Sequence, residues 1–251
     1  MILVQKLETA LKDEVRKLKN QTLAISIQNL TKHYGKSRGV NNLSLNVEQG
    51  DIFGFLGPNG AGKSTLMKCL FGIYSCDEGK ILLEGKNFAP KNPKEALELG
   101  VAMVHQELNQ ALKRNINDNL WLGRYPTRLG FAVSEKEMTR RTSLLLSELE
   151  INADPKTVME SMSVSKRQMV EIAKAISYGS KIIVLDEPTS SLNDREAEQL
   201  FKTIKRLRDR GCGIIYISHK MEEILRISDE VTVMRDGRLI ATYPKDRLTT
   251  D

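Results

Sequence analysis

A glycine-rich run at residues 57–65 is the feature that most limits how this chain can fold. The run reads GPNGAGKST and matches the pattern G-x-x-x-x-G-K-[ST]. The mostly apolar residues 51–56 before it predict a buried strand, and residues 66–71 after it predict a helix. A strand, a glycine loop and a helix in this order predict a phosphate-binding P-loop rather than a loop that only turns the chain.

The residues of this loop divide the work of holding a nucleotide. Its glycines allow backbone N–H groups to turn toward phosphate oxygens, and the following helix N-terminus favours anions. We expect Lys63 to reach the β- and γ-phosphates of a nucleotide and Ser64 to bind Mg²⁺. The predicted nucleotide-binding residues of the loop are Gly57, Asn59, Gly60, Ala61, Gly62, Lys63, Ser64 and Thr65.

Two carboxylates at the end of another apolar run form the second half of the predicted site. Asp186 and Glu187 follow residues 182–185. An aspartate at a strand end can hold Mg²⁺ through water, as in a Walker B motif. The adjacent glutamate can act as the general base for the attacking water. A capped strand end before Pro188 is the structural alternative, and the upstream P-loop makes it the weaker one.

Three further side chains are candidates for contact with a nucleotide. His219 and Gln106 each follow an apolar run. There a ring nitrogen can meet the γ-phosphate, and an amide can reach Mg²⁺ or the attacking water. Tyr34 can stack on an adenine ring, and a place in the core is an equal alternative for it. We expect His33 and His105 to be structural.

Composition and charge exclude several classes of protein. The chain has 251 residues, of which 40% are hydrophobic and 28% charged, as in a soluble globular protein of one or two domains. It has no apolar run of about 20 residues that could span a membrane. Its three cysteines lack metal-ligand spacing, which predicts a reduced, cytosolic protein. The net charge of +6 permits an anionic partner without requiring one.

The pattern of apolar residues predicts an α/β domain behind an N-terminal extension. Residues 1–21 predict an amphipathic helix that packs on the domain, pairs with a partner helix or is an added segment. Between 107 and 165 helices dominate, with a capping box of Ser134 and Glu137. Residues 25–27 and 43–47 predict antiparallel strands, and residues 80–83 and 101–104 predict further short strands. Residues 181–185 and 213–217 predict buried parallel strands, and Asp236-Gly237 predicts a hairpin.

In their order along the chain, these motifs resemble an ATP-binding cassette ATPase domain. The order is the P-loop, Gln106, residues 162–168, Asp186-Glu187, residues 190–193 and His219. The resemblance covers residues 24–251. It implies a P-loop NTPase fold of the α/β class, with a RecA-like core and an antiparallel β subdomain. It also implies that the ATPase domain spans 22–251, with a helical subdomain inserted at about 107–170.

From about residue 66 onward the resemblance narrows to the ATPases of sugar importers. It rests on residues 66–74, 103–109, 121–126, 169–174 and 211–224. Here the chain is most similar to the first cassette of the galactose/methyl galactoside type of monosaccharide importer. Residues 24–65 look more like single-cassette exporter ATPases. A natural mosaic and an engineered chimera are therefore both open.

The segment that matches the family's signature departs from it. Residues 162–166 read MSVSK where the family has Leu-Ser-Gly-Gly-Gln. Ser163 is kept and can donate to a γ-phosphate, whereas the loss of two glycines weakens close approach of the backbone. The resemblance implies a pair of cassettes with ATP between one P-loop and the other's signature. We therefore expect a second cassette with an intact signature to complete this P-loop.

Together these features predict an ATP-binding and ATP-hydrolysing subunit, or half-subunit, that energises bacterial monosaccharide import. The implied partners are ATP with Mg²⁺, a membrane permease and a second cassette, at the cytoplasmic face of the cell membrane. An exporter ATPase is the first alternative. The second, from another class, is a soluble cassette ATPase that acts on DNA or ribosomes, or a chimera without transport. No nucleic-acid partner is expected, and the sequence does not identify the sugar.

Overall fold

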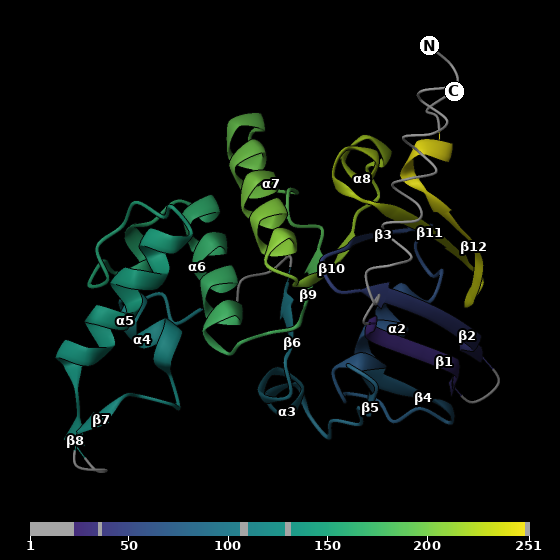
Figure 1. Cartoon of the computed structure of the whole chain (residues 1–251), viewed down its shortest axis with the longest axis horizontal. Coiled ribbons are helices and arrows are strands. Elements are labelled where there is room, and N and C mark those ends of the chain that lie inside the picture. The colour runs from purple at the N-terminus through teal and green to yellow at the C-terminus, as the bar shows by residue number, and fades with distance from the viewer. Residues whose placement is uncertain (1–22, 35–36, 106–109, 129–131, 249–251) are drawn as a thin grey trace.

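The computed structural model describes residues 23–34, 37–105, 110–128 and 132–248. The helix predicted for residues 1–21 and the candidate Gln106 lie outside these residues, so both stay predictions. Figure 1 shows two sheets with their helices on one side of the molecule and a cluster of helices, α4, α5 and α6, on the other.

A six-stranded sheet runs through the centre of the molecule in the order β12-β11-β3-β10-β9-β6. Its strands are β3 (Ile52–Leu56), β6 (Val101–Val104), β9 (Ile182–Asp186), β10 (Gly213–Ile217), β11 (Glu230–Arg235) and β12 (Arg238–Pro244). The strands from β11 to β6 pair in parallel, and β12 pairs antiparallel to β11. The parallel strands predicted at 181–185 and 213–217 and the hairpin predicted at 236–237 are confirmed.

Strand β10 shows why these parallel strands are apolar throughout. Ile214 and Tyr216 belong to an apolar cluster formed with α6 and α7. Ile215 and Ile217 belong to a second cluster, formed with α2 and the antiparallel sheet. Successive side chains of a strand point to opposite faces, so a central strand between two cores needs an unbroken apolar run.

A smaller antiparallel sheet covers one face of the central sheet. Its order is β2-β1-β4-β5, with β1 (Leu23–Tyr34), β2 (Ser37–Glu48), β4 (Glu78–Leu83) and β5 (Lys86–Asn87). Ile25 and Ile27 of β1 share a core with Phe53 and Phe55 of β3, which joins the two sheets. The antiparallel strands predicted before the P-loop are thus confirmed.

The helices lie around these sheets and beside them (Figure 1). They are α2 (Lys63–Leu70), α3 (Pro93–Glu98), α4 (Ile116–Trp121), α5 (Glu135–Glu148), α6 (Val164–Ser177), α7 (Asp194–Asp209) and α8 (Met221–Ile227). Two 3-10 turns, η1 (Met159–Ser161) and η2 (Lys245–Arg247), and a hairpin of β7 (Thr127–Arg128) with β8 (Ala132–Val133) complete the described elements. The helices predicted between 107 and 165 are present, whereas the limits of a helical subdomain at 107–170 stay a prediction.

The capping box predicted at the start of α5 is wrong. The Ser134 hydroxyl does accept the backbone N–H of Glu137, at 3.4 Å. The Ser134 N–H, however, donates to the carbonyl oxygen of Pro126 at 2.8 Å, and two arginines of the next turn hold the Glu137 carboxylate. A complete box stands at α7 instead, where Asn193 and Glu196 each bind the other's backbone N–H.

Candidate active site

Four loops of the candidate site meet because the strands before them are parallel neighbours. Strands β3, β10, β9 and β6 lie side by side and run in one direction, so their carboxyl ends share one edge of the sheet. The P-loop follows β3, Asp186 ends β9, His219 follows β10 and His105 follows β6. The structure therefore brings together the two halves of the predicted site, which are about 120 residues apart in the sequence.

The P-loop presents an uncapped helix N-terminus. Helix α2 begins at Lys63, and its N-cap residue Gly62 has a φ of +101° and no side chain to accept an amide hydrogen bond. Free N–H groups at a helix start form an anion site. The Lys63 ammonium folds back onto the Gly57 carbonyl oxygen. Burial lowers the pKa of Lys63, while the carboxylates of Glu187 and Asp186 act in the opposite direction.

Asp186 and Ser64, the two predicted Mg²⁺ ligands, lie in the same cavity. Both line a cavity of about 680 Å³ beside the P-loop. Burial, and then the nearby Glu187, raises the pKa of the Asp186 carboxyl. Among the described residues no group of three or more His, Cys, Asp or Glu side chains could hold a metal. Two oxygen ligands fit Mg²⁺, because that ion keeps several waters and also binds substrate phosphates.

The candidate base Glu187 is in direct contact with His219. Its backbone has a φ of +47° and donates its N–H to the carbonyl oxygen of Ile217 at 2.9 Å. Its Oε1 accepts the backbone N–H of His219 at 2.9 Å and lies 2.9 Å from the Nδ1 of that ring. Few residues other than glycine adopt this backbone conformation, and those that do are concentrated at functional sites.

Tyr34 lies at the surface beside the P-loop helix rather than in the core. Its side chain is 39% exposed. The Tyr34 hydroxyl donates to Thr65 Oγ1 at 3.3 Å, and its ring meets that of Tyr74 edge-on at 5.4 Å. His33 and His105 are also exposed, so neither is a buried structural histidine. His105 instead lines the cavity that holds Asp186.

The signature segment stands apart from the P-loop of the same chain. Ser163 caps α6 by accepting the backbone N–H of Lys166 at 3.4 Å, and its hydroxyl lies 3.0 Å from that of Ser165. Ser163 and Lys166 line a cavity of about 230 Å³ that contains neither Ser64 nor Asp186. Of the predicted site residues that the structure describes, Ser163 is therefore the one it does not bring to the phosphate site.

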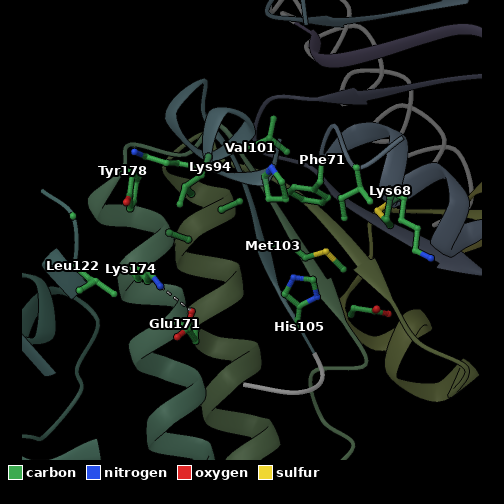
Figure 2. A pocket seen from close by; sticks show the side chains of 18 of the residues that line it. Lys68, Phe71, Lys94, Val101, Met103, His105, Leu122, Glu171, Lys174 and Tyr178 are labelled. Carbon is green, nitrogen blue, oxygen red and sulfur yellow. Dashed lines mark ion pairs between the residues drawn. The ribbon is translucent and has the colours of Figure 1, made fainter. Parts of the chain in front are cut away.

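The large cavity continues from the phosphate site into an apolar groove, which the sequence did not indicate. Figure 2 shows side chains of helices and of β6 pointing into it from opposite walls. The groove is lined by apolar residues of α2, α3, β6 and the segments after α2, α4 and α6: Met67, Phe71, Ile73, Leu97, Met103, Leu122 and Tyr178. Lys68, Lys94 and Lys174 stand around these walls, and Lys174 pairs with Glu171 at 4.0 Å.

Comparisons with known proteins agree with this geometry. Residues 40–190 match the family model described as ABC transporter. The chain is 56% identical to a galactose/methyl galactoside import ATP-binding protein of Treponema denticola and 53% to one of Clostridium perfringens. The match covers 88% and 93% of this chain and 44% and 45% of those relatives. A solved nucleotide-free ATP-binding cassette from an ABC transporter shares the fold with a TM-score of 0.78 and 26% identity, over 88% of this chain and 91% of that one.

The chain therefore belongs to the ABC transporter family, as an ATP-binding cassette with a P-loop NTPase fold. It spans less than half the length of the curated relatives named above. An alignment of 234 residues must include most of residues 24–65, so the likeness to importers is not confined to residues after 65. A mosaic origin stays a prediction. In the described parts of the chain, none of the helices has the length and apolar character needed to cross a membrane.

Proposed function

We propose that this chain binds Mg·ATP and hydrolyses it at the shared edge of the parallel strands. One observation carries the proposal: the P-loop, Asp186 and the Glu187–His219 pair stand at the ends of neighbouring parallel strands. Membership of the ABC transporter family supports it. The names of the relatives support monosaccharide import as the process that hydrolysis drives.

Nucleotide binding is assigned to α2 and the loop before it. The free amides of the first turn and the Lys63 ammonium bind phosphate oxygens. Tyr34, exposed beside Thr65, stacks on the adenine ring. The oxygen donors of Ser64 and Asp186 fit Mg²⁺, which when bound neutralises the charge of the phosphates. The remaining residues of the cradle are Gly57, Asn59, Gly60, Ala61 and Gly62.

Proton transfer is assigned to Glu187. Its carboxylate takes a proton from the attacking water, and its bond from the His219 backbone fixes the direction of the carboxylate. His219 also senses the γ-phosphate, because the second nitrogen of its exposed ring is free of the Glu187 contact. Gln106, which follows β6 and His105, is assigned to Mg²⁺ and the attacking water.

Replacing Glu187 tests the chemistry. Gln keeps the shape of the side chain but cannot take up a proton, so phosphate release should fall by about 100-fold or more. ATP affinity should stay within about threefold, because binding rests on other residues. Lys63→Ala should weaken ATP binding at least about tenfold, whereas Lys202→Ala, exposed on α7, should not. Release of phosphate by Glu187→Gln at the parent rate would show that another group is the base.

A second cassette with an intact signature is part of the proposal. Ser163 lies outside the phosphate cavity of its own chain, and the relatives are more than twice as long as the matched segment. A homodimer would place Val164 and Ser165 against ATP in both sites, where close backbone contact is weak. Sedimentation of Glu187→Gln with Mg·ATP should therefore show monomers. Adding Val164→Gly, Ser165→Gly and Lys166→Gln should produce dimers, and a tight dimer without these changes would contradict the asymmetric pair.

The apolar groove is assigned to a short cytoplasmic helix of a membrane permease, which would hold the cassette at the inner face of the membrane. Apolar walls bordered by Lys68, Lys94 and Lys174 suit an amphipathic helix with acidic residues at its edges. The groove opens from the cavity that Ser64 and Asp186 line. Movement of a helix in the groove can therefore change the geometry of the phosphate site.

A charge placed in the groove tests this partner. Ile73, 52% exposed, lines the groove, whereas Leu144, 58% exposed, lies on α5 outside it. We expect Ile73→Asp to abolish co-purification with the permease of the Treponema denticola importer expressed in membranes, and Leu144→Asp to leave it intact. Equal retention of both variants would remove the groove from the docking surface.

A further inference from the structure

A carboxylate that lies outside the nucleotide site accepts hydrogen bonds from two loops of that site. Glu223 lies in the first turn of α8, and its side chain is 15% exposed. Thr189 Oγ1 donates to its carboxylate oxygens at 2.7 and 2.6 Å, and the Tyr216 hydroxyl donates at 2.9 Å. The Lys220 ammonium adds a bond at 2.9 Å and the Ser218 hydroxyl a longer one at 3.4 Å.

These donors flank the two residues proposed to act on the γ-phosphate. Thr189 stands two residues after Glu187, in the segment that follows β9, and Ser218 and Lys220 stand on either side of His219, in the segment between β10 and α8. The two loops touch through Glu187, whose Oε1 meets both the backbone N–H and the ring of His219. Glu223 is thus a further tie between the same two loops.

The hydroxyl donors are buried, so they depend on the Glu223 carboxylate as their acceptor. Thr189, Ser218 and Tyr216 are 3%, 0% and 0% exposed, so water does not replace a lost acceptor for their hydroxyls. Burial opposes the charge of Glu223, but bonds from Thr189, Lys220 and Tyr216 outweigh it and place the pKa of Glu223 below its ordinary value. The group is ionised at neutral pH and acts only as an acceptor, which suits its donors.

We propose that Glu223 is a positioning residue for ATP hydrolysis: its carboxylate fixes the loop of Glu187 against the loop of His219. This inference rests on the proposed function, because Glu223 acts through Glu187 and His219 and is assigned no contact with ATP or water of its own. Glu223 affects the rate of hydrolysis through the alignment of Glu187. A displacement of about 1 Å at a reacting group can cost about 100-fold in rate. The Glu187 carboxylate contacts the backbone N–H and the ring of His219, so its direction depends on how the two loops are held together.

The variants separate positioning from stability. Thr189→Val cuts the tie to the Glu187 loop and is nearly isosteric, whereas Thr189→Ser keeps the hydroxyl. Glu223→Gln keeps the shape but presents an amide N–H₂ to its donors. Glu222→Gln is the matched control, because Glu222 is the exposed neighbour of Glu223 on α8. We expect Thr189→Val and Glu223→Gln to lower kcat by about tenfold or more, with KM within about threefold. Thr189→Ser and Glu222→Gln should match the parent.

A second readout does not depend on hydrolysis. The chain has three histidines, so the imidazole signals of His219 can be resolved by NMR and assigned with a His219→Gln variant. Loss of the tie should shift the His219 signals in Thr189→Val and Glu223→Gln. His33, on β1 in the other sheet, should keep its signals in every variant. A role in stability alone would lower the melting temperature but leave kcat and the His219 signals unchanged.

The two proposals fail in different ways. If the parent releases no phosphate from ATP, the proposed function falls, and the His219 signals still decide whether Glu223 ties the loops. If the parent is active and Glu187→Gln is not, the proposed base stands. In that case Thr189→Val and Glu223→Gln with parental kcat and parental His219 signals overturn the positioning role.

Discussion

Two glycines of the P-loop offer a matched pair of substitutions that measures how tightly the loop is held. Both have left-handed backbone, with a φ of +82° at Gly60 and +101° at Gly62. A Cβ at Gly60 would meet nothing within 4 Å. A Cβ at Gly62 would stand 2.7 Å from the carbonyl oxygen of Gly39 and 3.1 Å from the Cα of Gly237. The two positions therefore share the backbone strain and differ in the steric clash.

The expected magnitudes follow from these two contributions. Left-handed backbone costs an alanine about 1–2 kcal/mol, which is the expected loss for Gly60→Ala. Gly62→Ala adds overpacking against backbone atoms that cannot rotate away, worth about 1–3 kcal/mol. The gain from a stiffer unfolded chain, about 0.4–1 kcal/mol, is common to both and cancels in the difference. Gly62→Ala should thus be less stable than Gly60→Ala by about 1–3 kcal/mol.

Urea unfolding without nucleotide measures this difference. With a slope of about 2 kcal/mol per M, a difference of 2 kcal/mol moves the midpoint by about 1 M. The same samples should show weaker ATP binding for Gly62→Ala than for Gly60→Ala, because a displaced Gly62 turns the first amides of α2 away from the phosphates. Equal free energies of unfolding for the two variants would refute the idea that Gly39 and Gly237 fix the course of the loop.

Two titratable groups give further predictions. The pKa of Asp186 is raised in the folded state, so the charge of this carboxylate lowers the stability of the fold as pH rises from about 4. Asp186→Asn should therefore be more stable than the parent between about pH 4 and 8, but it should lose Mg²⁺-dependent ATP binding. Thermal unfolding that shows no gain in stability would contradict this. The hydrogen bond with Cys69 lowers the pKa of Cys76 to about 7, whereas burial raises that of Cys212 to about 12. Iodoacetamide at pH 7.5 should therefore label Cys76 first by peptide mass spectrometry, and faster labelling of Cys212 would count against it.

Local chemistry explains which parts of the site could be predicted from the sequence. Residues 51–71 encode strand, loop and helix within one continuous stretch, so the P-loop needed no knowledge of the rest of the fold. The hairpin at Asp236 and Gly237 is similar, because both residues adopt the positive φ that its tight turn requires. In each case the residues that determine the structure are neighbours in the sequence.

What could not be predicted depends on the order of strands in space. Glu187 and His219 touch only because β9 and β10 are adjacent, and Glu223 reaches both loops from a third element. The groove draws its apolar walls from α2, α3, β6 and the segments after α2, α4 and α6, which are far apart in the sequence. At α5, Glu137 had the right spacing for a capping box, but nearby arginines compete for its carboxylate.

Helix α6 connects the three features on which the proposed function depends. Its first turn is the altered signature, where Ser163 caps the helix and the two residues that replace glycines continue it. In its middle, the buried Gln168 donates to the carbonyl oxygen of Pro188 at 2.6 Å, next to Glu187. Near its end Lys174 faces the groove. A helix of 14 residues is about 21 Å long. Under the proposed function, a permease helix that displaced the groove end of α6 would therefore also displace the signature segment and the loop of Glu187.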